Sequence, residues 1–265
     1  MLTTIWNSAA ITLVVLIGML CSISICAADV LEDALVAVWL FDENQGLEAA
    51  DASGNGHDGN IKGAKWIQGK IGTGLEFNGD GNIVEIPHDA DFDLTEYTIS
   101  AWIKTEPTGL WQTVIGKEPV AGNPRNYGIF VAGNTNLLGV NYTTAGAWKT
   151  AFSKTVAADN KWHHVAATFD GEFLRAYFDG VMEGETRTEI PPDHNTEPVR
   201  IGRWGNPRGD YWSGVLDEVA MFNQALTEDE IQDITMNMRD ALAVEAMGKL
   251  AVAWGALKHS GTQRH

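Results

Sequence analysis

Residues 214–223 read GVLDEVAMFN, and residues 224–231 continue QALTEDEI. The first segment is rich in β-branched and other apolar residues, which favours a strand. The second segment predicts a helix start, because Thr227 is a good N-cap and the Glu230 side chain, three residues on, can bond back to it. We therefore expect a strand over Val215–Phe222 that is followed at once by a short capped helix from Thr227 to about Arg239.

This predicted strand carries two carboxylates among apolar residues. Side chains alternate between the two faces of a strand, so Asp217 lies on one face and Glu218 on the other. A carboxylate among apolar neighbours is tolerated when it is paired, hydrogen-bonded or bound to a metal ion. Whichever face meets the core, one of these two acids needs such a partner.

The N-terminus is typical of an exported protein. Residues 11–27 are almost continuously apolar, and Cys26-Ala27-Ala28 offers small residues for cleavage, so residues 1–28 are predicted to be a signal peptide. No Lys or Arg precedes the apolar run, and an uncleaved membrane anchor is the alternative. We expect a secreted, cell-surface or periplasmic protein whose mature chain has no membrane span. Both cysteines lie in the signal segment, so the mature chain would have no disulfide.

Composition limits the partners and the number of domains. The chain has 35 acidic and 18 basic residues and a net charge of -17, which argues against nucleic acid as a partner and suits a protein that binds cations. About 235 of the 265 residues remain after the signal segment, enough for one large β domain.

From Ala34 onward, short β-prone segments alternate with turn residues, which predicts an antiparallel sandwich or barrel. Asp-Gly pairs at Asp170 and Asp179 predict two tight hairpin turns that join three consecutive strands. Residues 236–265 form a separate C-terminal tail in this interpretation. The predicted strands are Leu35–Phe41, Leu75–Phe77, Ile83–Ile86, Thr98–Lys104, Thr113–Gly116, Tyr127–Val131, Leu138–Tyr142, Thr150–Ser153, His163–Phe169, Leu174–Phe178, Val199–Gly202 and Val215–Phe222.

Several short motifs occur together in one order. They are AVWLFDE (37–43), DASGNGHDG (51–59), LEFNG (75–79), YTISAWIK (97–104), WHHVA (162–166), YFDG (177–180) and LDEV (216–219) followed by ALT (225–227). In order and spacing they resemble the laminin G-like, concanavalin A-like jelly-roll domains of bacterial secreted proteins. The resemblance implies an all-β, antiparallel two-sheet jelly-roll sandwich over residues 33–235 with one short C-terminal helix. It also implies carbohydrate or protein binding, often with one calcium ion.

The segment at residues 51–59 supports a calcium site on its own chemistry. Oxygen-bearing residues alternate at Asp51, Ser53 and Asn55, and a glycine follows, as in the first half of a calcium-binding loop. Lys62 stands where such a loop would place its bidentate acid, so a remote carboxylate must complete the ligand shell.

Asp217 is the candidate for that remote carboxylate, and the resemblance adds Asp42 as a weaker ligand. The predicted structural calcium site therefore consists of Asp51, Asn55, Asp217 and Asp42. The alternative is a surface turn in which the Asp and Asn side chains bond their own backbone.

No catalytic constellation emerges from the sequence. His163 and His164 are adjacent in a predicted strand, so their side chains leave on opposite faces and cannot easily share an ion. No Gly-x-Ser-x-Gly motif occurs. We expect a non-catalytic protein, and a glycoside hydrolase with carboxylates from separate strands is the enzymatic alternative.

The motif Gly-Asn-Pro-Arg occurs twice, at residues 122–125 and 205–208, and indicates two related loops. Sugars stack on aromatic planes while Asn, Asp and Arg side chains bond their hydroxyl groups. An extracellular glycan or glycoprotein is the predicted partner. The alternatives are plain turns over packed aromatic residues, and a protein-protein adhesion or scaffolding module without glycan affinity. The candidate ligand-binding residues are Trp204, Asn206, Arg208, Asp210, Tyr211, Arg125 and Tyr127.

Overall fold

The computed structural model describes residues 31, 33–119, 124–205, 210–236 and 238. Residues Leu35–Met238 form one compact unit. The predicted signal peptide and most of the predicted tail lie outside the described residues. Within those ranges, no helix combines the length and apolar character needed to cross a membrane.

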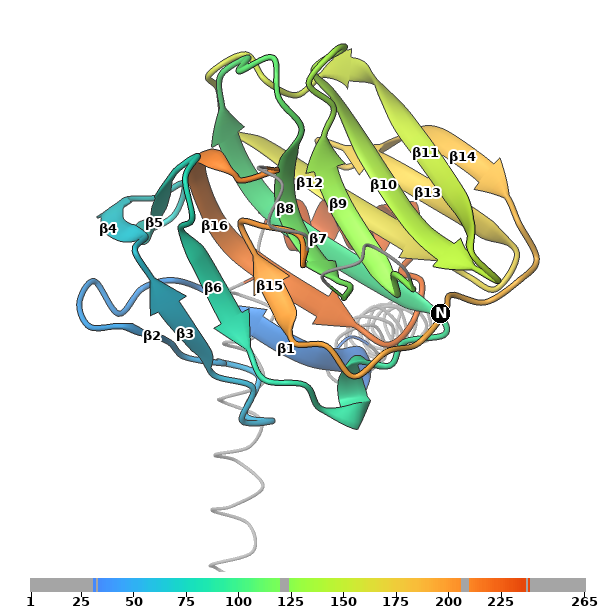
Figure 1. Ribbon diagram of the computed structural model, residues 1–265, viewed down its shortest axis with the longest axis horizontal. Helices are drawn as coiled ribbons and strands as arrows, with labels where there is room; N and C mark the ends of the chain where they lie inside the picture. Colours follow the sequence, from blue (N-terminus) through green and yellow to red (C-terminus); the bar gives the residue numbers. More distant parts are fainter. Residues whose placement is uncertain (1–30, 32, 120–123, 206–209, 237, 239–265) are drawn as a thin grey trace, which may run out of the picture. The chain divides into compact units, whose positions relative to one another are not determined.

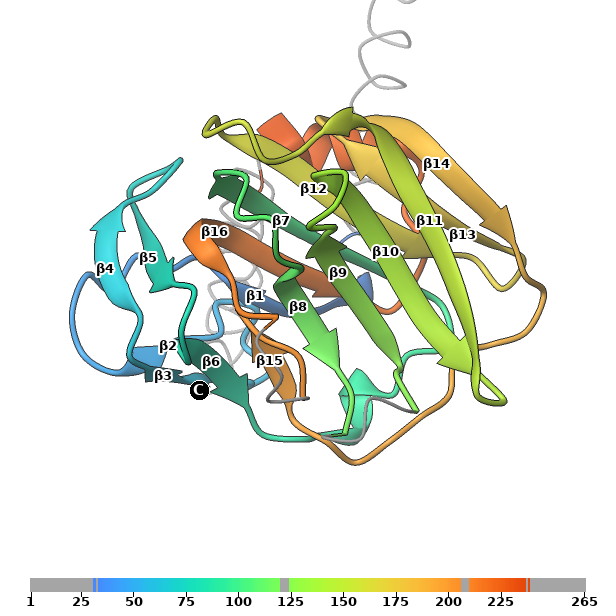
Figure 2. The ribbon, with the colours of Figure 1, turned by 45° about the horizontal axis from the view of Figure 1, so that its top comes forward.

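The unit Leu35–Met238 is a sandwich of two antiparallel sheets, as Figures 1 and 2 show. Sheet A has the order β14-β13-β12-β7-β16-β5-β4, and β1 also pairs with β16; sheet B has the order β11-β10-β9-β8-β15-β6-β3-β2. The predicted jelly-roll sandwich is confirmed. The strands are β1 Leu35–Trp39, β2 Glu48–Ala49, β3 Gly59–Lys62, β4 Lys65–Gln68, β5 Thr73–Asn78, β6 Ile83–Ile86, β7 Tyr97–Thr105, β8 Gln112–Lys117, β9 Tyr127–Val131, β10 Leu137–Thr144, β11 Ala147–Val156, β12 His163–Phe169, β13 Phe173–Phe178, β14 Val181–Arg187, β15 Val199–Ile201 and β16 Ser213–Phe222.

Alternation along the strands places the core between the sheets. In β9, Tyr127, Ile129 and Val131 are fully buried members of the main core. Phe130 points the other way and belongs to a separate small cluster with Ala132 and Trp204. The outer face of sheet B therefore has its own packed aromatic residues, apart from the core.

Strand β16 is central to sheet A. It pairs with β7 on one side, and on the other with β5 at Ser213–Leu216 and with β1 at Val219–Phe222. The predicted contact between the first strand and the closing strand is confirmed. β1 ends at Trp39, two residues earlier than predicted, and Phe41 takes a positive φ of 53°.

A bulge in β16 changes the prediction for its two acids. Glu218 has a φ of 48°, and the register with β7 shifts between Asp217 and Ala220, so simple alternation fails there and both acids are buried. Asp217 accepts hydrogen bonds from the backbone N–H groups of Lys70, Ile71 and Glu218 at 2.8, 3.0 and 2.9 Å. Burial raises the pKa of Asp217 to about 7. The sequence required that a carboxylate buried in this strand be paired, hydrogen-bonded or bound to a metal ion. For Asp217, the three backbone hydrogen bonds meet that requirement.

The two predicted Asp-Gly turns take different forms in the structure. Asp179 and Gly180 have φ values of 48° and 81° and form the predicted tight turn between β13 and β14. At Asp170 the turn is wider, because only Gly171 has a positive φ and the Asp170 carboxylate accepts the N–H groups of Glu172 and Phe173.

The helix over residues 228–236 has its predicted cap: Thr227 N–H donates to Glu230 at 2.7 Å.

Candidate functional site

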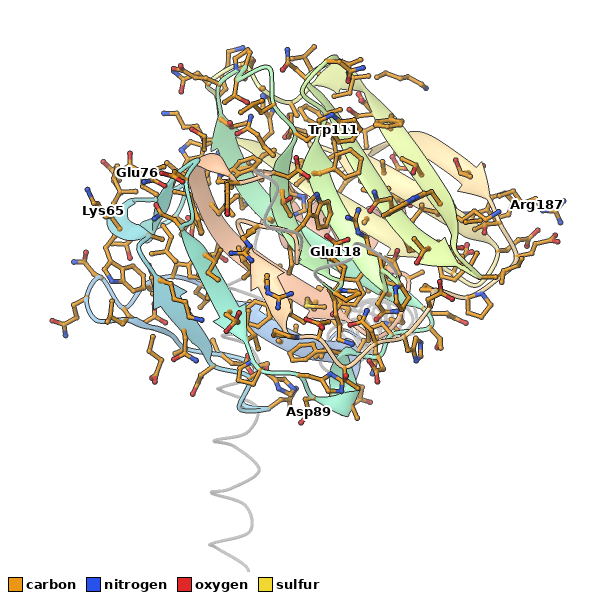
Figure 3. All side chains as sticks on the ribbon, in the orientation of Figure 1. Lys65, Glu76, Asp89, Trp111, Glu118 and Arg187 are labelled. Carbon is orange, nitrogen blue, oxygen red and sulfur yellow. The ribbon has the colours of Figure 1, made fainter. Side chains whose placement is uncertain are left out.

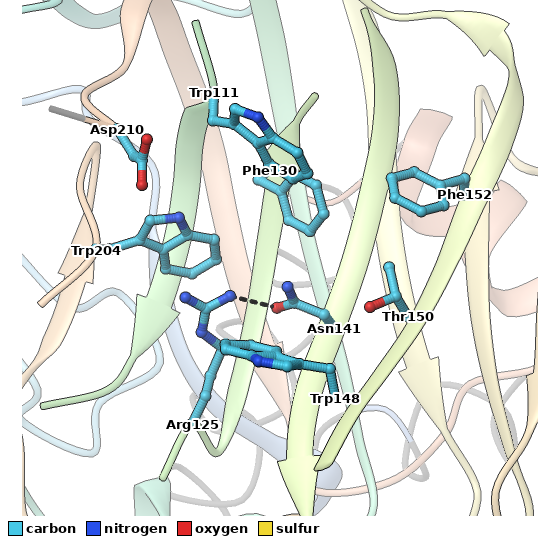
Figure 4. Close-up of a pocket in the computed structure, with 9 residues that line it drawn as sticks. All are labelled: Trp111, Arg125, Phe130, Asn141, Trp148, Thr150, Phe152, Trp204 and Asp210. Atoms are coloured by element: carbon cyan, nitrogen blue, oxygen red, sulfur yellow. Dashed lines mark hydrogen bonds between the residues drawn. The ribbon is translucent and has the colours of Figure 1, made fainter. Parts of the chain in front are cut away.

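A cavity of about 320 Å³ lies on the outer face of sheet B, between the strands β8 to β11 and the segments that flank β15 (Figure 4). Its lining combines five aromatic side chains with four polar ones, so a ligand there meets both stacking planes and hydrogen-bonding groups. The lining residues are Trp111, Arg125, Phe130, Asn141, Trp148, Thr150, Phe152, Trp204 and Asp210.

Three glycines on neighbouring strands form the floor of this region. A Cβ atom at Gly116 of β8 or Gly128 of β9 would lie 2.2 or 2.3 Å from the Trp204 ring. A Cβ at Gly139 of β10 would lie 2.2 Å from the Phe130 ring. The two aromatic rings therefore rest directly on the sheet backbone, which only glycine permits at these positions.

Three aromatic rings lie around Phe130: the exposed Trp111 and Phe152 and the buried Trp204. The Phe130 centroid lies 5.0 Å from that of Trp111, 5.9 Å from Phe152 and 6.1 Å from Trp204. Trp111, Phe152 and Trp148 are 43, 41 and 47% exposed. Exposed aromatic side chains that gather around one cavity make this region a candidate interaction surface.

Arg125 is fixed between two tryptophans (Figure 4). Its guanidinium carbon lies 3.6 Å from the Trp204 centroid and 4.5 Å from that of Trp148. Nε donates to Glu118 at 2.6 Å, Nη2 pairs with the same carboxylate, and Nη1 donates to Asn141 at 2.8 Å. Burial lowers the pKa of Arg125, and the Glu118 carboxylate acts against that shift. The charged network holds both indole rings in place.

Asp210 contributes the carboxylate of the cavity lining. It is half-buried, and this burial raises its pKa, while the nearby Arg125 charge lowers it. A half-buried carboxylate at a cavity wall can accept hydrogen bonds from hydroxyl groups of a ligand.

The structure brings together three of the ligand-binding residues predicted from the sequence: Trp204, Arg125 and Asp210 line the cavity. Tyr127 does not, because it is fully buried in the main core on the opposite face of sheet B, with its hydroxyl 3.4 Å from the Phe92 carbonyl. Tyr211 is not a lining residue either, and lies under the Arg203 guanidinium at 5.7 Å. Asn206 and Arg208 lie outside the described residues.

Sequence reasoning missed the contribution of β11 and its neighbours. Trp148, Thr150 and Phe152 alternate in the segment AWKTAFSK, a period-2 pattern that places them on one face of a strand. The glycines inside β9 and β10 were a second signal, since glycine in a strand often marks the close approach of another group. The other missed lining residues are Trp111, Phe130 and Asn141.

The residues predicted to bind calcium lie in two places. Asp51 accepts four hydrogen bonds, from the N–H groups of Val38, Ser53 and His57 and from the Ser53 hydroxyl. The Asn55 side chain donates to the carbonyls of Leu35 and Val36. Both residues thus lie against the edge of β1 that does not pair with β16.

The other two predicted ligands flank the turn between β4 and β5. Asp42 accepts the Thr73 N–H at 3.0 Å, and Asp217 accepts those of Lys70 and Ile71. Among the described residues there is no group of three or more His, Cys, Asp or Glu side chains that could hold a metal ion. A carboxylate offers about four acceptor positions, so Asp51 would have to exchange hydrogen bonds for the ion. Calcium binding stays a prediction.

Comparison with known proteins agrees with this architecture. Residues 78–232 match the family model described as the concanavalin A-like lectin/glucanases superfamily. The chain belongs to this superfamily. No curated protein matches the sequence.

Solved structures similar to this concanavalin A-like chain include the following three domains. The binding domain of Paraclostridial Mosquitocidal Protein 1 has a TM-score of 0.66 and 17% identity, over 77% of this chain and 52% of that one. Domain 4 of AbnA, a GH43 extracellular arabinanase from Geobacillus stearothermophilus in complex with arabinotriose, has a TM-score of 0.63 and 22% identity, over 76 and 98%. The binding domain of Botulinum neurotoxin DC in complex with rat synaptotagmin II has a TM-score of 0.60 and 14% identity, over 79 and 52%.

The chain spans about half the length of the mosquitocidal-protein and neurotoxin binding domains. At these identities the likeness shows the fold alone.

Proposed function

We propose that this protein is a non-catalytic, extracellular binding module that holds a saccharide, free or attached to a protein, in the cavity on the outer face of sheet B. One observation carries the proposal: exposed Trp111 and Trp148 rings stand beside Arg125, Asn141, Thr150 and Asp210 around a single cavity. Aromatic planes stack against the C–H faces of sugar rings, and the polar groups bond their hydroxyls.

The carboxylates of the site support a binding role over hydrolysis. Glycoside hydrolysis generally needs two carboxyl groups on either side of the scissile bond. Within the part of the chain that the structure describes, Asp210 is the carboxylate that lines the cavity, and the buried Glu118 carboxylate is bound by Arg125. In AbnA domain 4, a chain with the same fold, the bound molecule is arabinotriose.

A glycan array that is read with and without calcium tests the proposal. We expect the wild type to bind at least one saccharide and Trp148→Ala to bind it about tenfold more weakly, since a lost stacking plane costs roughly 1–1.5 kcal/mol. Leu47→Ala is the matched control, because Leu47 is 72% exposed and precedes β2, at the opposite edge of sheet B from β11. Equal binding by wild type and Trp148→Ala would place the site elsewhere.

A protein partner is the second candidate. Apolar side chains are also exposed outside the cavity lining, with Leu110, next to Trp111 in the chain, at 62% and Val156, at the end of β11, at 44%. Exposed apolar side chains of this kind also suit a protein interface. An array on which wild type binds no saccharide in either calcium condition would make the protein-binding alternative the better interpretation.

A further inference from the structure

Among the described residues, the charged side chains that line the cavity, together with the Glu118 that pairs with one of them, leave one carboxylate in excess. Arg125 and Glu118 are 6 and 1% exposed and form a buried ion pair, so their charges cancel. Asp210 is the remaining charged residue of the lining. Counted over these described residues, the cavity lining and its Glu118 partner carry a charge of about one negative unit when Asp210 is ionised.

Most of the N–H groups of the Arg125 guanidinium and both of its faces are already in contact with other side chains, so few remain for an anionic ligand. Trp204 and Trp148 cover the two faces of its guanidinium. Glu118 takes two of its N–H groups and Asn141 takes a third, out of the five that an arginine has. A ligand carboxylate or sulfate would have to compete with Glu118, which is already in contact and buried, for this cation.

From this arrangement we infer, resting on the proposed function, that the cavity binds uncharged saccharides in preference to those with carboxylate or sulfate groups, with Asp210 as the specificity-determining residue. A hydroxyl group can donate to the Asp210 carboxylate, whereas an anionic substituent cannot and is repelled by it. Two like charges within about 8 Å, at the effective dielectric constant of a partly buried site, favour the neutral ligand by roughly tenfold or more.

Matched saccharide pairs that differ only in charge test the inference. The probes are cellohexaose against its C6-oxidised glucuronate form, oligogalactose against oligogalacturonate, and unsulfated against sulfated oligogalactose. We expect wild type to bind a neutral member at least about tenfold more tightly than its acidic counterpart. Asp210→Asn, which keeps the side-chain shape, should reduce this ratio at least fivefold, and a melting curve checks that the variant folds.

Glu76→Gln is the control, since it removes one negative charge from an exposed site on β5 in sheet A, away from Trp111 in Figure 3. Its ratio should equal that of wild type. If wild type binds no saccharide, the proposed function fails. If wild type binds saccharides but holds the acidic member as tightly as the neutral one, or if Asp210→Asn changes the ratio no more than Glu76→Gln does, this inference is overturned and the proposed function stands.

Discussion

At the scale of single residues, His164 shows how burial sets the response to pH. Its side chain is 1% exposed, its Nδ1 lies 2.8 Å from the Thr235 hydroxyl, and its ring meets the Trp102 ring at 5.5 Å. Burial lowers the pKa of His164 from 6.5 to about 3. Between these values the unfolded chain binds a proton at this residue and the folded protein does not. The contribution to stability is therefore complete above about pH 6.5 and is lost as pH falls toward 3.

We predict that His164→Gln flattens this response. Relative to the variant, wild type should lose about 1.4 kcal/mol of unfolding free energy for each pH unit below 6, because it alone must exclude that proton. Urea unfolding of both proteins between pH 7 and pH 4 measures the difference. If the unfolding free energies of the two proteins fall in parallel with pH, the lowered pKa of His164 is contradicted.

At the scale of elements, the glycines of sheet B position the aromatic rings of the cavity. We predict that Gly116→Ala lowers the free energy of unfolding by about 1–3 kcal/mol and weakens saccharide binding, because the new Cβ would overlap the Trp204 ring. The same substitution in a Trp204→Ala background should cost less than half as much, since the atoms near that Cβ belong to this ring. Equal costs in both backgrounds, measured by chemical denaturation, would show that the ring does not depend on the glycine.

The loop at residues 51–58 gives a second prediction for an element. The Asp51 carboxylate receives four hydrogen bonds that hold this loop against β1. Asp51→Ala should therefore lower the free energy of unfolding by about 2–4 kcal/mol even in EDTA, because several donors lose their acceptor. A variant as stable as wild type in EDTA would contradict the assignment of these bonds.

Adding calcium to EDTA-treated wild type tests the metal prediction in the same measurements. A calcium ion that binds the native state raises the melting temperature by mass action, and a chelator reverses the rise. Asp51→Asn should then show no rise. An unchanged melting temperature for wild type would contradict the prediction that the native state binds calcium.

The sequence predicted the elements with strong local patterns and missed those set by tertiary contacts. β16 and its capped helix were predictable from residues 214–231, whereas the bulge that buries both Asp217 and Glu218 depends on pairing with β7. Short strands with polar residues, such as β3 and β4, carry no clear alternation of apolar residues and were missed. The site was predicted in part through Trp204 and Arg125. Trp148 joins them because β11 pairs with β10, and strand pairing between distant segments is not written in local sequence.

At the scale of the whole molecule, the core and the cavity lie on different faces of the sheets. Their inner faces share one core, which includes Trp39 and Trp212. The outer face of sheet B carries a separate aromatic cluster and the cavity. The core residues that stabilise the fold are therefore separate from the residues that line the cavity, which suits the proposed binding site on a rigid scaffold.

The most direct test of saccharide binding in this cavity is an NMR titration of the indole N–H signals with a saccharide that the array identifies. We predict that the signals of Trp111, Trp148 and Trp204 shift with saturation, because these rings line the cavity. The signals of Trp39 and Trp212, which are fully buried in the core, should stay in place. A saturating titration in which all three cavity signals stay in place would contradict the account.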